Sequence, residues 1–269
     1  MSSLWTPDRP GGPHLPSLEL TLPDSEIDDL LDSTVDVDDE SAVALLCHGS
    51  VELLGRMPYS SNATFLVTVD DGSNHTQAIY KPEAGERPLW DFPPGLWRRE
   101  VGAYQLAVAL GWAIVPPTVI RRDAPRGVGS VQYFVPARYS EHYFTLRDQP
   151  RYRRTLEQIC LLDVVSNNTD RKGGHCLLGR DERVWAIDNG LSFHSEFKLR
   201  TVIWDFAGDA IPDDLREDLR RVSEHAPSTL GELLHPSENA AVIERARALV
   251  DHGRFPTDPT GRLHPWPLV

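Results

Sequence analysis

Three side chains that together suit phosphoryl transfer lie between residues 161 and 193. Asp170 ends a polar loop after an apolar segment, His175 follows five residues later, and Asp188 begins the tripeptide Asp-Asn-Gly after a second apolar segment. Phosphoryl transfer uses one loop acid to orient the acceptor hydroxyl and a second acid to hold the metal ion that bridges the phosphates. A further metal ligand commonly stands five residues after the first acid. We therefore predict Asp170 as the catalytic base, and Asp188 and His175 as metal ligands.

The same residues also suit ordinary turns, because Asn, Asp and Gly dominate turns for steric reasons. Asn-Thr-Asp alone is equally typical of a helix stop, and Asp-Asn-Gly alone is equally typical of a hairpin turn. Two predicted strands, residues 176–178 and 184–187, separate the two fragments. The combination at this spacing favours a phosphotransfer site over two unrelated turns.

Two charged residues upstream supply the nucleotide-binding pair that such a site needs. Lys81 closes an apolar strand, the position from which kinases contact the α- and β-phosphates. Residues 95–110 then have helical periodicity and include Glu100, which we predict to pair with Lys81. Glu83 and Glu86 are rival partners, although their place in a proline-rich linker favours exposure to solvent.

Two backbone segments are predicted to contact the nucleotide. Ser60, Ser61 and Asn62 lie in a polar turn between strands predicted over residues 51–56 and 63–69. We expect their backbone N–H groups near the phosphates, with an ordinary hairpin turn as the alternative. Pro136 and Ala137 follow the last predicted strand of this half, residues 131–135, and we expect this hinge to bind the adenine edge.

Basic residues beside Asp170 are predicted to stabilise charge on the transferred group. Arg171 is predicted as a catalytic residue, with Lys172 as the alternative. Asp163, near the end of a helix predicted over residues 146–165, is expected to hold Arg171 or the loop backbone, since acids beside active sites often support their neighbours.

The two motifs resemble those of a known family. Asn-Thr-Asp-Arg, residues 168–171, followed by Ala-Ile-Asp-Asn-Gly-Leu-Ser-Phe, residues 186–193, is similar to the catalytic loop and metal motif of type II phosphatidylinositol 4-kinases. The element Asn-x-Asp-Arg also resembles HipA-type atypical kinases. Over about residues 42–225 the chain resembles actinobacterial PI3/PI4-kinase-like proteins. This resemblance implies ATP with Mg²⁺ or Mn²⁺ as cofactors, and a hydroxyl acceptor on a protein, a small metabolite or an inositol lipid.

One residue departs from the family pattern, because the lipid kinases have Asn where this chain has His175. Imidazole binds Mn²⁺ or Zn²⁺ more readily than Mg²⁺, which prefers oxygen ligands. Two alternatives to a kinase therefore stay open: transfer of AMP from a nucleotide bound in the reverse orientation, and a nucleotide-binding pseudokinase that acts as a scaffold.

The charge of the chain limits its partners. With 40 acidic against 27 basic residues the formal net charge is −13, which repels nucleic acid and anionic membranes. We expect no nucleic acid partner, and the charge disfavours an inositol lipid as acceptor. A third hypothesis is an acidic interaction module without catalysis that recruits a basic partner.

The chain shows no feature of a membrane or secreted protein. No apolar run approaches the roughly 20 residues that a membrane helix needs, so we expect no integral membrane association. The first residues lack the pattern of a signal peptide, and we expect a cytoplasmic protein.

The order of the predicted elements indicates an α+β, bilobal, protein-kinase-like fold, with an antiparallel N-lobe sheet, one N-lobe helix and a mostly helical C-lobe. We expect an acidic, partly disordered arm over residues 1–40, a kinase-like N-lobe over 41–136 and a C-lobe over 137–269 that carries the catalytic loop and metal motif. Trp204 and Phe206 are expected in the core rather than in a substrate pocket. The proline-broken tail after residue 254 is expected to pack as an extended strap or to fray.

Overall fold

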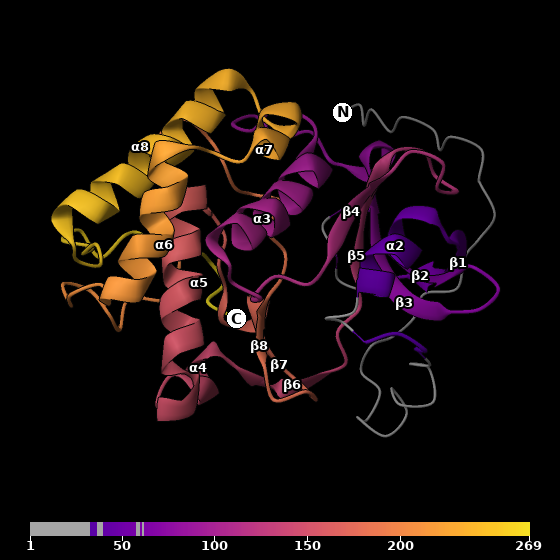
Figure 1. Ribbon diagram of the computed structural model, residues 1–269, viewed down its shortest axis with the longest axis horizontal. Coiled ribbons are helices and arrows are strands. Elements are labelled where there is room, and N and C mark those ends of the chain that lie inside the picture. Colours follow the sequence, from indigo (N-terminus) through magenta and orange to yellow (C-terminus); the bar gives the residue numbers. More distant parts are fainter. Residues whose placement is uncertain (1–32, 37–39, 58–59, 61) are drawn as a thin grey trace, which may run out of the picture.

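The computed structural model describes residues 33–36, 40–57, 60 and 62–269. Most of the predicted acidic arm lies outside these residues. The described chain forms a sheet-rich N-terminal half and a helix-rich C-terminal half, which lie side by side (Figure 1).

The N-terminal half is built on a five-stranded antiparallel sheet of order β1-β2-β3-β5-β4. Its strands are rich in Val, Ile, Thr, Phe and Tyr, the residues that pack well on a pleated surface. Helix α2, Glu40–His48, packs against strands of this sheet. The strands are β1 Ser50–Arg56, β2 Phe65–Asp70, β3 His75–Pro82, β4 Thr118–Arg121 and β5 Gly129–Tyr133.

Helix α3, Leu96–Leu110, lies between the sheet and the C-terminal helices (Figure 1). Gly111 ends it in the left-handed conformation, with φ of 76°, and its N–H donates to the carbonyl groups of Ala107 and Val108. Glycine adopts this conformation without steric cost, which explains the sharp end of the helix. Several buried side chains of α3 join the larger of two apolar cores, which also contains side chains of the C-terminal helices.

The C-terminal half contains a second, three-stranded antiparallel sheet and five further α-helices among the described residues. The strands are β6 Ala137–His142, β7 Cys176–Gly179 and β8 Val184–Ala186, in that order. The helices are α4 Tyr143–Leu146, α5 Arg153–Ser166, α6 Asp213–Glu224, α7 Ser228–Leu233 and α8 Pro236–His252. Short 3₁₀ turns occupy Glu83–Gly85, Pro150–Tyr152 and Gly173–His175.

The predicted fold class is confirmed, and two details differ. The helix expected over residues 146–165 begins only at Arg153, as α5, after α4 has ended at Leu146. Pro150 lies between the two and lacks the N–H that a continuous helix needs. Helix α7 was not predicted, because its six residues are too few to show a helical period. The lobe boundary expected at residue 136 stays a prediction, although several buried side chains of α3 join the larger core.

The smaller core joins α2 to the five-stranded sheet and also includes Trp185 of β8. A residue from the second sheet therefore packs against the first. Among the described residues, no helix is long and apolar enough to cross a membrane.

Candidate active site

Lys81 and Glu100 form an ion pair that joins β3 to α3. Strand β3 fixes the lysine through its pairing with β5, where Lys81 lies opposite Ser130. The Glu100 side chain is only 4% exposed, and its Oε2 accepts a hydrogen bond from the backbone N–H of Asn189 at 2.9 Å. The structure therefore brings together the predicted pair. The rival Glu86 has another role: its carboxylate accepts from the N–H groups of Gly95 and Trp97, at the start of α3.

Asp188 lies directly beside this pair. Its Oδ1 accepts a hydrogen bond from Lys81 Nζ at 2.7 Å, and its side chain is half-exposed. Asp188 has a φ of 56°, a left-handed conformation that is uncommon outside glycine and typical of strained or functional sites. The ammonium group of Lys81 is the main cause that holds the pKa of Asp188 far below its ordinary value, so the carboxylate is charged. Burial alone would lower the pKa of Lys81, but the carboxylates of Asp188 and Glu100 outweigh it and raise that pKa.

His175 faces the second oxygen of Asp188, with 3.4 Å between Nε2 and Oδ2. Burial is the main cause that lowers the pKa of His175, which favours the neutral imidazole that metals bind. The backbone of Lys172 donates a long hydrogen bond of 3.5 Å to Nδ1. The two predicted metal ligands, Asp188 and His175, thus lie together.

The donor set of this pair fits a divalent metal that keeps other ligands. Among the described residues, no group of three or more His, Cys, Asp and Glu side chains is placed to hold a metal ion. Asp188 and His175 would therefore supply one carboxylate and one imidazole, with phosphate oxygens and water as the remaining ligands. Mg²⁺ in phosphotransfer sites is commonly held by one or two carboxylates together with substrate phosphates, and the imidazole of His175 would shift the preference toward Mn²⁺.

Asp170 lies on the loop after α5. Its backbone N–H donates to Asn168 Oδ1 at 2.9 Å, which shapes the turn, and its Oδ2 lies 2.9 Å from Lys172 Nζ. Both side chains of this ion pair are partly exposed. Lys172, the alternative to Arg171 in the sequence, is thus the basic residue that lies beside the predicted base.

Arg171 does not occupy the predicted place beside the transferred group. Its side chain is 0% exposed, and its guanidinium group pairs with Asp163 at 2.9 Å and donates to the Ile187 carbonyl at 2.7 Å and to Asn189 Oδ1 at 2.5 Å. A guanidinium group enclosed by these partners cannot also contact a phosphate. The supporting role expected for Asp163 is confirmed, and Arg171 joins it in linking the catalytic loop to the Asp-Asn-Gly turn.

Asn189 is a site residue that the sequence reasoning took only as part of a turn. It is buried, and it contacts Arg171 through its side chain and Glu100 through its backbone. The signal available in the sequence was the position of Asn189 directly before Gly190, after an apolar strand. A Cβ atom added at Gly190 would lie 3.1 Å from Glu100 Oε1. Only the fold reveals that closeness.

The predicted nucleotide-binding backbone is less completely placed. Ser60 and Asn62 lie in the connection between β1 and β2, and Asn62 Oδ1 accepts from the Arg87 N–H at 2.9 Å. Ser61 lies outside the described residues. The Pro136 carbonyl accepts from the Arg180 N–H at 2.9 Å, and Ala137 is buried and pairs with Gly179. Contacts of these residues with a nucleotide therefore stay a prediction.

The aromatic residues downstream divide between core and surface contacts. Phe206 is buried against Phe255, as expected for a core residue. Trp204 is partly exposed, and its Nε1 donates to the Thr201 carbonyl at 2.7 Å.

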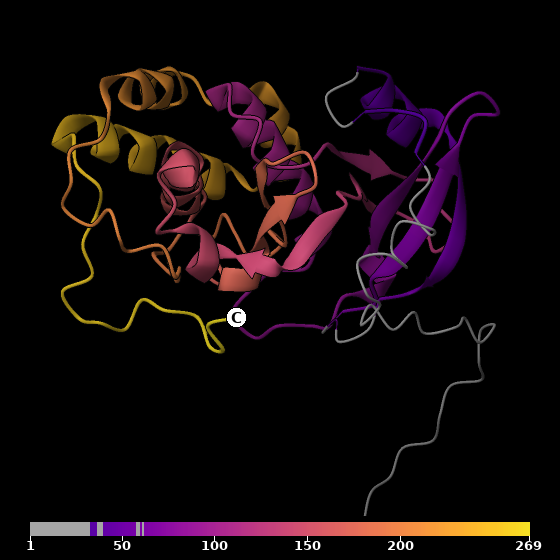
Figure 2. The ribbon, with the colours of Figure 1, turned by 90° about the horizontal axis from the view of Figure 1, so that it is seen from below.

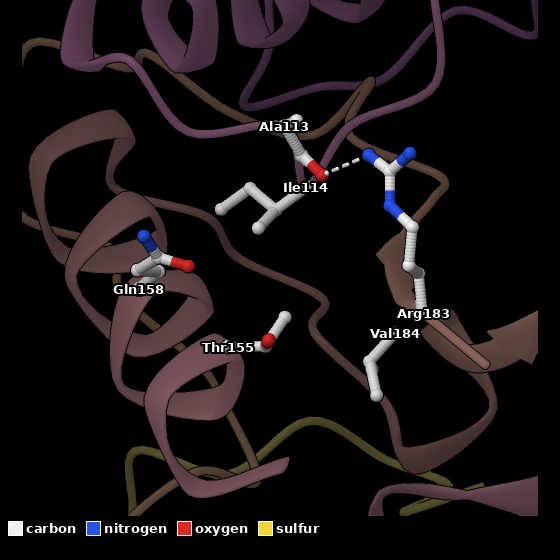
Figure 3. A pocket seen from close by; sticks show the side chains of 6 residues that line it. All are labelled: Ala113, Ile114, Thr155, Gln158, Arg183 and Val184. Atoms are coloured by element: carbon white, nitrogen blue, oxygen red, sulfur yellow. Dashed lines mark hydrogen bonds between the residues drawn. The ribbon is translucent and has the colours of Figure 1, made fainter. Parts of the chain in front are cut away.

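A pocket of about 400 Å³ lies elsewhere, between α5, β8 and residues 113–114 (Figure 3). Arg183 crosses its rim, where Nη2 donates to the Ala113 carbonyl at 2.9 Å. None of the predicted catalytic side chains lines this pocket, so it is separate from the candidate site.

Comparisons with known proteins show which family the chain is similar to. A family profile described as phosphatidylinositol 3- and 4-kinase matches residues 114–234, which include Asp170, His175 and Asp188. Protein Rv2133c of Mycobacterium tuberculosis is 37% identical over 268 residues, and the match covers 86% of this chain and 95% of that protein. The chain belongs to the PI3/PI4-kinase-like family.

A solved structure extends the likeness of this PI3/PI4-kinase-like protein to its fold. The structure of hydra Fam20 with sugar has a TM-score of 0.54 at 12% identity, and the match covers 81% of this chain and 91% of that one. The Helicobacter pylori proinflammatory kinase CtkA has a TM-score of 0.44 at 10% identity, over 78% of this chain and 94% of that one. At 12% identity the likeness to hydra Fam20 concerns the fold alone.

Proposed function

We propose that this PI3/PI4-kinase-like protein is a metal-dependent phosphotransferase that moves the γ-phosphate of ATP to a hydroxyl group. One observation carries the proposal: Lys81 contacts Glu100 and Asp188 at once, where β3, α3 and the Asp-Asn-Gly turn meet. A salt bridge that only stabilises the fold would need one acidic partner for the lysine. A lysine held by one buried acid and one half-exposed acid suits a group that binds phosphate.

In this proposal Glu100 orients Lys81 toward the phosphates and Asp188 takes the metal ion. The metal would neutralise charge on the phosphates, with His175 as a further ligand. Asp170 orients the acceptor hydroxyl and accepts its proton. The acceptor oxygen then forms its bond to the γ-phosphorus as the bond to the bridging oxygen of ADP breaks. The protein contributes position and charge rather than covalent chemistry.

The acceptor is proposed at the level of its chemistry, a hydroxyl group on a protein or a small metabolite. The net charge of −13 opposes approach to anionic lipid surfaces, so an inositol lipid is the less favoured acceptor. We propose that the protein works in the cytoplasm.

Nucleotide binding and turnover together test this proposal. We expect a fluorescent ATP analogue to bind, and ADP to form only with added Mg²⁺ or Mn²⁺. Lys81→Met should weaken nucleotide binding and remove turnover. Glu86→Gln is the matched control, because Glu86 is a nearby acid that caps α3 and does not contact Lys81. Absence of nucleotide binding by the full chain would overturn the proposal.

A further inference from the structure

The segment after α8, residues 254–269, runs along the lower edge of the C-terminal half in Figure 2 and ends near the junction with the N-terminal half. We call it the strap. Its first part is anchored in the core: Phe255 is buried against Phe206, and the Phe255 N–H and carbonyl pair with Asp209 and Gly208 at 3.0 and 3.1 Å. The strap thus leaves α8 from a fixed point.

The middle of the strap pairs with the segment that follows the metal motif. The Leu263 carbonyl accepts from the Thr201 N–H at 3.1 Å and from Trp204 Nε1 at 3.4 Å. The Asp258 carboxylate accepts from the Leu263 N–H at 2.9 Å, which holds the preceding loop closed. The backbone of Leu263 is therefore fixed on both sides.

Thr201 in turn pairs with the catalytic loop. A parallel bridge joins Arg171 to Thr201, in which the Arg171 N–H donates to the Arg200 carbonyl and the Val202 N–H donates to the Arg171 carbonyl, each at 3.1 Å. Three chain segments therefore lie in order: the catalytic loop, residues 200–202, and the strap.

The end of the strap contacts the catalytic loop directly. The Gly173 N–H donates to the Leu268 carbonyl at 2.7 Å. A Cβ atom at Gly173 would lie 2.8 Å from the Phe144 ring and 3.3 Å from the Leu268 carbonyl oxygen. The glycine thus allows a close approach that a side chain would prevent, three residues after the predicted base Asp170.

These contacts concern one side of the site. In the described part of the chain, the side chains of Lys81, Glu100 and Asp188 form hydrogen bonds and ion pairs with one another, with Asn189 and with His175. None of these contacts involves the strap. The strap contacts the loop of Asp170 and the segment beside it, where the acceptor would be recognised.

We propose that the strap is a positioning element that fixes the catalytic loop for the acceptor and has no part in nucleotide binding. The proposal rests on the phosphotransferase function proposed above. Misplacing a catalytic group by about 1 Å can cost roughly a hundredfold in rate, while a distant binding pair is unaffected. Loss of the strap should therefore lower kcat and leave the affinity for nucleotide unchanged.

The test compares the full chain with two variants. One lacks residues 263–269, and the other is Gly173→Ala, which keeps the strap but places a methyl group close to the Phe144 ring and the Leu268 carbonyl. We expect kcat for the formation of ADP from ATP to fall about 10- to 100-fold in both variants. The dissociation constant of a fluorescent ATP analogue should stay within about twofold. Arg262→Ala is the control, because this exposed strap residue has no described side-chain contact.

Hydrogen exchange decides the proposal independently of activity. Gly173 and Thr201 donate to the strap, so their amides should lose protection in the truncated chain. The informative amides are Arg171 and Val202, which do not contact the strap and should lose protection as well. Unchanged protection at these two amides, or a nucleotide affinity that falls in parallel with kcat, would overturn the proposal. A wild-type chain without turnover would instead contradict the proposed function, and hydrogen exchange would still test the strap.

Discussion

At the scale of single residues, Asp188 has contacts that a nucleotide would have to rearrange. Its Oδ1 is held by Lys81 and its Oδ2 faces His175. Phosphate groups would attract Lys81 and leave Asp188 free for a metal ion, so the affinity for metal should rise when nucleotide is present. The same three residues would thus serve both the nucleotide and the metal ion.

The substitution His175→Asn tests the choice of metal, because it replaces the imidazole with the amide found in type II lipid kinases. Amide oxygen suits Mg²⁺ better than imidazole does. We expect the ratio of turnover in Mg²⁺ to turnover in Mn²⁺ to rise by about tenfold. Steady-state rates with each metal measure this ratio. An unchanged ratio would assign His175 a structural role.

The substitution Arg171→Met tests the buried link between the catalytic loop and the metal motif. It leaves Asp163 without its main partner in a fully buried place, which typically costs about 3 to 5 kcal/mol of folding free energy. Urea unfolding measures this loss. Arg220→Met is the control, since its ion pair with Glu217 is exposed and should contribute less than about 1 kcal/mol. Equal losses in the two variants would contradict the account.

The role of Arg171 shows why site residues are harder to predict than motifs. The spacing of Asp170, His175 and Asp188 is local, and the structure brings His175 and Asp188 together as expected. Whether a basic residue beside Asp170 faces the site or the core depends on contacts with α5 and the Asp-Asn-Gly turn. Those contacts are set by tertiary packing, which the sequence pattern does not contain.

At the scale of elements, α3 connects the two halves through different faces. Glu100 reaches Lys81 of the sheet, while the neighbouring Arg99 forms a buried ion pair with Glu238 of α8. Gly102 lies against Phe193, where a Cβ atom would be 3.3 Å from the ring. The helix is thus fixed to the C-terminal half, and the ion pair of Glu100 with Lys81 joins it to the sheet.

The substitution Glu238→Gln tests this attachment, because it leaves the buried Arg99 without a charged partner. We expect a loss of about 3 kcal/mol or more in the free energy of unfolding. Thermal and urea unfolding measure the loss. The matched control is Glu232→Gln, an exposed position on the neighbouring helix α7, where we expect almost no change. A loss below about 1 kcal/mol for Glu238→Gln would contradict the role given to this pair.

Elements with a clear period were predicted well from the sequence. Strands β1 to β3 and helix α3 have alternating or helical apolar patterns, and their observed limits lie near the expected ones. The break between α4 and α5 contains Pro150, and α7 is shorter than two helical turns. Short or broken elements depend on packing more than on local pattern.

At the scale of the whole molecule, two apolar cores meet where the candidate site lies. The smaller core includes Trp185 of β8, only three residues before Asp188, and the larger core includes α3 with Val101 beside Glu100. The predicted catalytic side chains are therefore supported by both cores. The net charge of −13 of the whole chain favours basic partners over anionic ones.

Removal of residues 1–32 tests whether the acidic arm belongs to the phosphotransfer function. Every predicted site residue lies beyond residue 59, so we expect nucleotide affinity within about twofold of the full chain. Titration of both chains with a fluorescent ATP analogue measures this. Loss of a basic protein partner with binding intact would add a recruiting role to the arm. Loss of nucleotide binding would contradict the placement of the site.

Paired label transfer shows whether the protein moves the γ-phosphate of ATP. The purified chain is incubated with ATP labelled at the γ-phosphate or at the α-phosphate, in Mg²⁺ and in Mn²⁺, with Asp188→Ala as the control. We expect transfer of the γ label alone. This transfer should be lost in Asp188→Ala, while the variant stays folded. Transfer of the α label would show AMP transfer, and bound ATP without any transfer would show a pseudokinase. Either result, or γ transfer that survives in Asp188→Ala, would contradict the account.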